Sequence, residues 1–107
     1  MRMLLKVNIP ICAGNAAVRE GTLGTIIQKI LADLKPEAVY FAEEDGERTG
    51  YVFFDMKNSS DLPAIAEPWF LALGAKITVR PAMNLQDLAA AAPAMERSAK
   101  AYPKPVK

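Results

Sequence analysis

The sequence predicts an α+β fold of the ferredoxin-like type, in which one antiparallel sheet carries its two main helices on one face. Two observations support it. The elements follow the order β-α-β-β-α-β with an added C-terminal helix, which is typical of the split βαβ arrangement with strands ordered 4-1-3-2. The stretch 48–56, RTGYVFFDM, is apolar at both odd and even positions, as expected of a central strand with material packed on each side.

Composition predicts a single globular domain. The chain has 107 residues, which fits one domain, assigned to residues 1–99, followed by a flexible tail at 100–107 that contains Pro103 and Pro105. Hydrophobic residues make up 51% and charged residues 23%, so the chain is globular rather than disordered. A net charge of +1 argues against a large electrostatic footprint, so neither nucleic acid nor a membrane is expected as a partner.

Cys12 is the single cysteine. It has no partner for an internal disulfide, so a reducing compartment and a cytoplasmic location are expected. We interpret Cys12 as a small apolar residue near the end of the first strand, since a reactive thiol would lack an activating histidine. The opening MRMLLKVNIP is broken at Lys6 and does not resemble a secretory signal, and no stretch reaches the ~18 apolar residues of a membrane span.

The first half of the chain predicts a strand, a helix and a second strand. Residues 2–9 alternate apolar and polar side chains, and Pro10 ends that strand. A helix is predicted over about 14–34, with an apolar stripe at Leu23, Ile26, Ile27, Ile30, Leu31 and Leu34. Gly21 and Gly24 predict a bend or a close approach to the sheet. A phosphate loop is the alternative, but the glycines follow a helical stretch and the Lys-Ser/Thr ending is absent.

The second half begins with a hairpin. The strand 37–44 is followed by Asp45-Gly46 and the strand 48–56, and this pair predicts a two-residue turn in which both residues have positive φ. An acidic metal loop is the alternative, although the carboxylates lack EF-hand spacing. A helix is predicted after 58–61, with a buried stripe at Leu62, Ile65, Ala66, Trp69 and Leu73, a kink or restart at Pro68 and an end at Gly74.

The last predicted elements are a strand and a helix. The strand covers 76–81, and Asn84 with Asp87 caps a helix that runs from Leu85 to about residue 99, with Pro93 distorting it. The apolar positions of this helix are Leu88, Ala91, Ala92 and Met95. Trp69 and Phe70, on the preceding helix, are interpreted as core residues rather than a ligand platform.

Strand parity predicts two different sheet faces. The helix-facing set is wholly apolar and comprises Met3, Leu5, Val7, Val39, Phe41, Val52, Phe54, Ile77 and Val79. The other set contains Leu4, Lys6, Asn8, Ala38, Tyr40, Ala42, Tyr51, Phe53, Asp55, Thr78 and Arg80. This face is too apolar for open water and too polar for a closed core. A homodimer that places two such faces together, with some enclosed polar groups, fits both properties.

Four segments resemble a known family: MRMLLKVNIP, ILADLKPEAVYF, RTGYVFFDM and IAEPWFLALGAKITVRPAM. Together they are similar to an uncharacterised family of small bacterial proteins in the dimeric α/β barrel superfamily, with likeness to about residue 99. The resemblance implies a homodimer of two facing ferredoxin-like sheets. The superfamily includes muconolactone isomerase-like enzymes, cofactor-independent monooxygenases, haem-degrading enzymes and YciI-like proteins. The Glu67-Pro68-Trp69-Phe70 run resembles a segment of YciI-like proteins, but their histidine has no counterpart here.

The absence of histidine excludes Ser-His-Asp and Cys-His catalysis and most zinc sites, and no metal or cofactor is expected. The remaining acid–base candidates are Asp55, Lys6, Tyr40, Tyr51 and Glu67. Parity predicts Asp55 near Lys6, either as an ion pair closing one end of a barrel or as a carboxylate of raised pKa that acts as a general base. The ion pair is the favoured interpretation.

The candidate ligand site comprises Lys6, Tyr40, Tyr51, Asp55 and Arg80. Two cations and one carboxylate leave a positive surplus, which Glu43 or Glu44, water or a ligand must balance if a dimer encloses it. A small carboxylate or enolate-like ligand held by Arg80 is predicted, and snorkelling of both cations at the rim is the alternative. Three functions stay open: a small-molecule-binding dimer, a cofactor-independent isomerase or monooxygenase, and an interaction module without a pocket.

Overall fold

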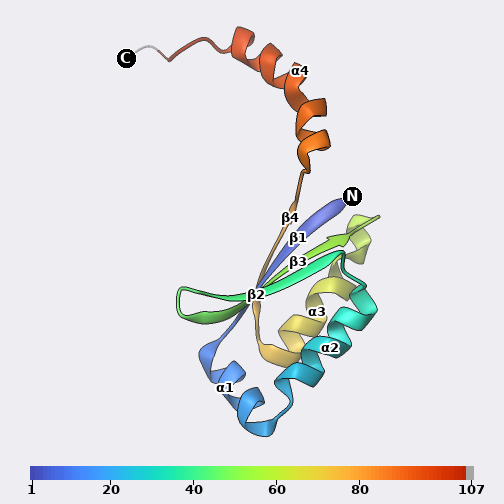
Figure 1. The fold of residues 1–107 in the computed structure, drawn as a ribbon, viewed down its shortest axis with the longest axis vertical. Coiled ribbons are helices and arrows are strands. Elements are labelled where there is room, and N and C mark those ends of the chain that lie inside the picture. Colours follow the sequence, from blue (N-terminus) through green and yellow to red (C-terminus); the bar gives the residue numbers. More distant parts are fainter. Residues whose placement is uncertain (106–107) are drawn as a thin grey trace.

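The computed structural model describes residues 1–105 as a four-stranded antiparallel sheet with helices packed on one face and a C-terminal helix that projects away (Figure 1). The elements are β1 (Arg2–Ile9), α1 (Ile11–Glu20), α2 (Leu23–Leu34), β2 (Ala38–Glu44), β3 (Glu47–Asp55), a 3-10 turn η1 (Ser59–Asp61), α3 (Leu62–Leu73), β4 (Lys76–Pro81) and α4 (Leu85–Ala101). The architecture is α+β and is compatible with a ferredoxin-like fold.

The sheet places β1 and β3 at its centre. Its order is β2-β3-β1-β4, which reads 4-1-3-2 from the β4 edge. Leu5 lies opposite Val52 on β3 and opposite Val79 on β4. Because side chains alternate along a strand, this register sends one apolar set toward the helices and the opposite set to the other side.

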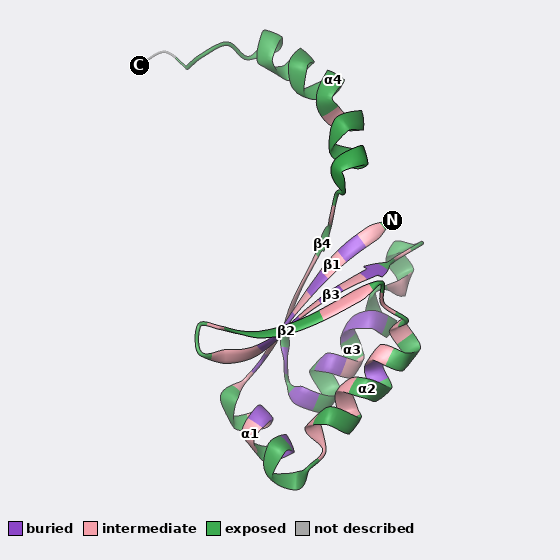
Figure 2. Ribbon diagram, in the orientation of Figure 1, coloured by how far each residue is buried: buried purple, intermediate pink, exposed green. Residues whose placement is uncertain are grey.

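The core lies between the two central strands and α3. Leu5, Val52 and Phe54 are almost completely buried, and Trp69 of α3 is buried with them. Figure 2 shows the buried residues concentrated along β1, β3 and the sheet-facing sides of the helices. The prediction that Trp69 is a core residue is confirmed. Phe70 is exposed, so the same prediction is wrong for Phe70, which lies at the margin of α3 and lines an open groove beside β4.

The β2–β3 hairpin is confirmed. Glu44 pairs with Glu47, so Asp45 and Gly46 form a two-residue loop. Both have positive φ, 53° and 79°, as a type I′ turn requires. The side chain of Glu43 accepts a hydrogen bond from the Gly46 N–H at 3.1 Å. The structure makes this segment a turn, not a metal loop.

The predicted helix 14–34 is wrong in its boundaries, because two helices occupy residues 11–34. α1 ends at Gly21, whose φ of 72° is left-handed, and the Gly21 and Thr22 N–H groups bond back to Val18 and Ala17. Glycine adopts this conformation without a Cβ penalty, which explains why the helix stops there. Cys12 lies on α1 and is exposed, so its predicted place near the end of the first strand is corrected.

The start and end of α3 agree with the sequence. A capping box of Asn58 and Asp61 begins η1, the 3-10 turn that leads into α3, and Gly74 ends α3 with a left-handed φ. Two details differ. Leu62 is 40% exposed, because it begins the helix at the margin of the core. The helix also continues through Pro68, so it does not restart at that residue.

α4 leaves the packed body of the molecule. It begins at the predicted Asn84–Asp87 capping box and continues through Pro93 to Ala101. None of its residues is buried, and the radius of gyration is 18.0 Å, against about 13 Å for a compact chain of this length. Residues 102–105 carry no helix or strand. Of the predicted tail, residues 106–107 lie outside the described residues.

Replacing Gly46 by Val tests the hairpin. A β-branched residue at this φ costs about 1–2 kcal/mol, so we expect chemical denaturation to show a loss of stability of that size. Gly24→Ala is the matched control, because Gly24 has an ordinary helical φ and open space around its Cβ position. That variant is expected to be neutral or to gain up to ~1 kcal/mol. Equal stability of Gly46→Val and wild type would contradict the turn assignment.

Candidate functional site

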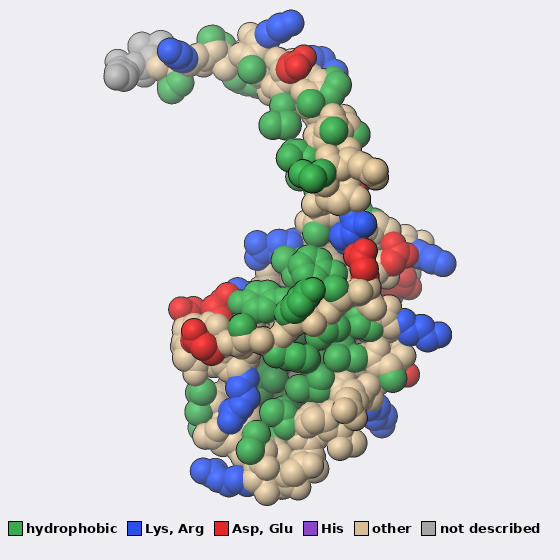
Figure 3. All heavy atoms as spheres, viewed as in Figure 1, with side chains coloured by type: hydrophobic (Ala, Val, Ile, Leu, Met, Phe, Trp, Pro, Cys, Tyr) green, Lys and Arg blue, Asp and Glu red, His purple; other side chains and the backbone are tan. Residues whose placement is uncertain are grey.

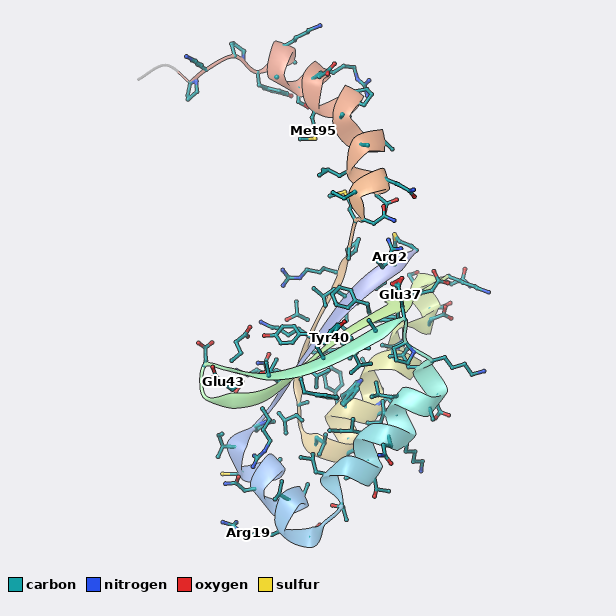
Figure 4. All side chains as sticks on the ribbon, viewed as in Figure 1. Arg2, Arg19, Glu37, Tyr40, Glu43 and Met95 are labelled. Atoms are coloured by element: carbon teal, nitrogen blue, oxygen red, sulfur yellow. The ribbon has the colours of Figure 1, made fainter. Side chains whose placement is uncertain are left out.

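The face of the sheet away from the helices carries the predicted site residues in lateral rows. The register places Lys6 beside Tyr51, and Tyr51 beside Tyr40. One row further, Leu4 lies between Phe53 and Arg80. Leu4, Tyr40, Tyr51 and Phe53 are therefore neighbours, as parity predicted. Tyr40 is 66% exposed, and Figure 4 shows it on the side of β2 away from the helices. We call this surface the open face.

Glu44 organises the hairpin end of the open face. Its carboxylate accepts a hydrogen bond from Lys6 Nζ at 2.8 Å and another from Tyr51 Oη at 2.8 Å. Beside this cluster, Asn8 Nδ2 donates to Thr49 Oγ1 at 3.1 Å. The sequence pointed to Glu44 only as one possible neutraliser of surplus charge. Its even position on β2, the parity of Tyr40, is the signal that places it on this face.

The hydrogen bonds of the cluster set its protonation. The bond from Lys6 is the main cause that lowers the pKa of Glu44, and the bond from Tyr51 adds to it. The same carboxylate raises the pKa of Tyr51, chiefly through their hydrogen bond. Glu44 is therefore an anion and Tyr51 a neutral donor near pH 7. Neither group is suited to serve as a general base at that pH.

Asp55 does not belong to this cluster. It lies opposite Arg2 in the register, four residues from the Lys6 row, or about 13 Å along the strand. Its carboxylate accepts a hydrogen bond from the Met1 amine at 2.7 Å, and the side chain is largely exposed. That bond is the first cause of its lowered pKa. The predicted Asp55–Lys6 ion pair is wrong, and so is the alternative of a general base with raised pKa.

Arg80 and Glu67 also lie apart from the Glu44 cluster. Arg80 is exposed in the row of Leu4, and no carboxylate of residues 1–105 forms an ion pair with it. Glu67 is exposed on α3 and lines a shallow groove beside β4. Of the predicted ligand set, the structure brings Lys6, Tyr51 and Tyr40 into one row and Arg80 into the next.

A separate apolar groove opens on the helix side of β2. It has a volume of about 610 Å³, and its lining includes Ile9, Ile11, Leu23, Ile27, Phe41 and Arg48. We call it the β2–α2 groove. Phe41 was expected to be covered by a helix, but it is 56% exposed. Its parity is as predicted, since Val39 of the same strand lies opposite the buried Val52. The groove between β2 and α2 leaves the Phe41 ring uncovered.

Arg48 enters the groove from β3. Its Nη1 donates to Asn15 Oδ1 at 3.1 Å, and a Cβ added at Gly14 would lie 2.7 Å from the same nitrogen. Gly14 thus leaves the space that the guanidinium occupies. Among residues 1–105 no carboxylate forms an ion pair with Arg48. Glu43 and Glu47 also line the groove, so its rim carries both signs of charge.

Within residues 1–105, no three Cys, Asp or Glu side chains are grouped in a way that could hold a metal ion. No helix in the same part of the chain combines the length and the apolar character needed to cross a membrane.

Comparison with known proteins gives no assignment. No protein-family model matches the chain, and no curated protein matches it either. The relation to the dimeric α/β barrel superfamily therefore stays a prediction.

The lowered pKa of Glu44 predicts a pH-dependent stability. A carboxyl whose pKa is lower in the folded state stabilises the fold above its unfolded pKa of about 4.3, and this contribution is lost as the pH falls through the folded pKa. Glu44→Gln should therefore unfold at a lower temperature than wild type at pH 7, and the difference should shrink below about pH 4. Glu67→Gln, outside the cluster, is the control. A difference between Glu44→Gln and wild type that stays constant from pH 7 to pH 3 would contradict the assignment.

Proposed function

We propose that the protein is a small-molecule-binding homodimer of the dimeric α/β barrel type, in which two open faces enclose a small carboxylate ligand. The observation that carries this proposal is Arg80, a guanidinium on the open face without an ion-pair partner among residues 1–105. On the same face, Lys6 is paired with Glu44, and Arg2 is paired with Glu37 and Asp87. Lys76, opposite Asn8, is exposed on the same strand as Arg80 but nearer the hairpin end. Arg80 is therefore the guanidinium of this face that has no carboxylate partner among residues 1–105.

The exposed aromatic surface supports the dimer. A sheet normally buries its apolar face against a second layer, and helices cover only one side of this one. On the open side, Leu4 and Phe53 are adjacent and only half-buried, and Tyr40 is exposed. A second copy placed on this face would remove these side chains from water and also exclude water from around Arg80.

The free guanidinium of Arg80 defines the ligand class. Arginine binds a planar carboxylate through two parallel N–H donors, and an enclosed guanidinium needs such an anion because an unpaired buried charge is costly. Tyr51 already donates to Glu44, so Tyr40 is the free phenol of this face. Tyr40 lies on β2 and Arg80 on β4, at opposite edges of the sheet. When two open faces meet about a two-fold axis parallel to the strands, β4 of each chain lies over β2 of the other, so a ligand on Arg80 would meet the Tyr40 of the second copy. Lys6 and Tyr51 then hold Glu44 in place rather than contacting the ligand.

The two other functions fit the structure less well. A cofactor-independent isomerase or monooxygenase needs a base near its substrate, and Asp55, the candidate for that role, is exposed and has a lowered pKa. An interaction module without a pocket would leave the position of Arg80 without a role. Measurements of dimer mass and of ligand binding separate a binding protein from an enzyme and from an interaction module.

The dimer is tested by mass. Sedimentation velocity of the full chain at micromolar concentration is expected to show about twice the monomer mass of 11.6 kDa. Tyr40→Asp should shift the protein toward monomer, since it places a charge in the interface. Phe70→Asp is the control, because Phe70 is also exposed but lies on the helix side of the sheet, between α3 and β4. Wild type that sediments only as an 11.6 kDa species would overturn the proposal.

Ligand binding is tested by thermal shift against small mono- and dicarboxylates, with matched amides as neutral probes. A ligand at 100 times its Kd adds about 2.7 kcal/mol, which corresponds to a rise in Tm of roughly 10–20 °C for a chain of this size. Arg80→Ala should abolish the shift, whereas Arg19→Ala, at the far end of α1 (Figure 4), should keep it. A shift that survives in Arg80→Ala would contradict the site. A dimer that responds to no carboxylate would favour the interaction module, and turnover of a bound acid would favour the enzyme.

A further inference from the structure

The β2–α2 groove combines an apolar wall with a single cation. The wall is formed by Ile9, Ile11, Leu23, Ile27 and Phe41, and Arg48 is the one basic side chain that residues 1–105 contribute to the lining. Figure 3 shows hydrophobic side chains gathered in the recess beneath β2, with a basic side chain and the acidic hairpin beside it. The groove volume of about 610 Å³ lies within the range of small-molecule sites, roughly 300–1,000 Å³.

Arg48 is held in the groove near the hairpin. It lies opposite Ile9 of β1 in the register and is half-buried, and its Nη1 donates to Asn15 Oδ1 at 3.1 Å. Gly14 lies directly beside the guanidinium, because a Cβ added there would be 2.7 Å from Nη1 and 3.5 Å from Cζ. The bond to Asn15 uses one of the five N–H donors of the side chain. The guanidinium is therefore positioned by its neighbours and keeps donors for another acceptor.

The two carboxylates that line the groove do not neutralise Arg48. Glu43 lies opposite Arg48 on β2, but its carboxylate accepts the Gly46 N–H at 3.1 Å across the turn and forms no ion pair with the guanidinium. Glu47 pairs with Glu44 and so has the parity of the open face. A cation without a carboxylate thus stands beside an apolar wall, and these two features match the two ends of an amphiphilic anion.

We propose that the β2–α2 groove is a binding site for an amphiphilic carboxylate such as a fatty acid. Arg48 binds the head group, because a guanidinium offers paired N–H donors to a planar carboxylate. The hydrocarbon chain lies along Leu23, Ile27 and Phe41, where it displaces water from the apolar wall and covers the exposed Phe41 ring. The site is on the helix side of the sheet, so it is separate from Arg80 and does not require the dimer.

The hydrocarbon part of the site is tested by isothermal titration calorimetry with hexanoate, octanoate and decanoate. The Kd is expected to fall about twofold to fourfold for each methylene that the groove buries. Phe41→Ala should reduce this gain, because it removes part of the wall at an exposed position. Phe70→Ala is the matched control, since Phe70 is also exposed but lines the separate groove beside β4, and it should keep the gain.

The head-group part is tested with octanamide and with Arg48→Gln. Octanamide has the same chain length without the charge, so wild type should bind it about tenfold more weakly than octanoate. Arg48→Gln should abolish this preference, because glutamine keeps N–H donors but carries no charge. Arg80→Ala is the matched control: it removes a guanidinium from the open face and should leave both the octanoate Kd and the preference unchanged. Circular dichroism checks that each variant is folded.

Three results would overturn the groove site. The first is equal binding of octanoate and octanamide by wild type, or no binding of any of the acids. The second is an octanoate Kd that is unchanged in Arg48→Gln, and if binding is instead lost in Arg80→Ala the acid belongs to the open face. The third is a dimer that Phe41→Asp weakens and Tyr40→Asp does not, since a second copy of the chain then occupies the groove.

The groove site and the proposed dimer can fail separately. Wild type that sediments as a monomer and binds octanoate through Arg48 would support the groove and overturn the dimer. A dimer that binds small dicarboxylates through Arg80, but shows no gain in affinity from hexanoate to decanoate, would support the open-face site and overturn the groove.

Discussion

The antiparallel pairing of β1 with β3 is the constraint on which the rest of the structure depends. Leu5 and Val52 face each other at the centre of the sheet with no exposed surface, and Trp69 closes the core against them. Because the side-chain period of a strand is two, this register also decides what the other face presents. Lys6 and Tyr51, one residue on, are placed together on the open face. A slip of one residue would bury these polar groups and expose the core.

The helices cover this sheet only in part. The break at Gly21 divides the residues before β2 into two short helices, and an apolar groove remains between β2 and α2. The C-terminal helix, which could have provided more cover, projects from the opposite edge. The body therefore has a well-packed centre and two uncovered surfaces, the open face and the groove beside Phe41. A second chain can bury either surface.

The sequence predicted the features that depend on local pattern. Strand parity, the Asp45-Gly46 turn and the Asn84–Asp87 capping box follow from spacing and φ preferences, which act over a few residues. Prediction from the sequence was wrong for contacts that depend on how far apart two elements lie in the folded chain. The partner of Lys6 is Glu44 and not Asp55, because the β1–β3 register places Asp55 opposite Arg2, four residues from Lys6, and parity alone does not fix the register. Phe41 has the predicted parity, yet no pattern within β2 reveals whether a helix reaches it.

The electrostatics divide the open face into two halves with different roles. Near the hairpin, Glu44 accepts hydrogen bonds from both Lys6 and Tyr51, so Lys6 is neutralised and these side chains are held in place. One row away, on the β4 edge, Arg80 forms no ion pair with a carboxylate of residues 1–105. Lys6 and Tyr51 already donate hydrogen bonds to Glu44, whereas the N–H donors of Arg80 are free to bind a ligand. Enclosure by a second chain would raise the free energy of the unpaired Arg80 guanidinium. An anion bound between the two sheets would neutralise that charge.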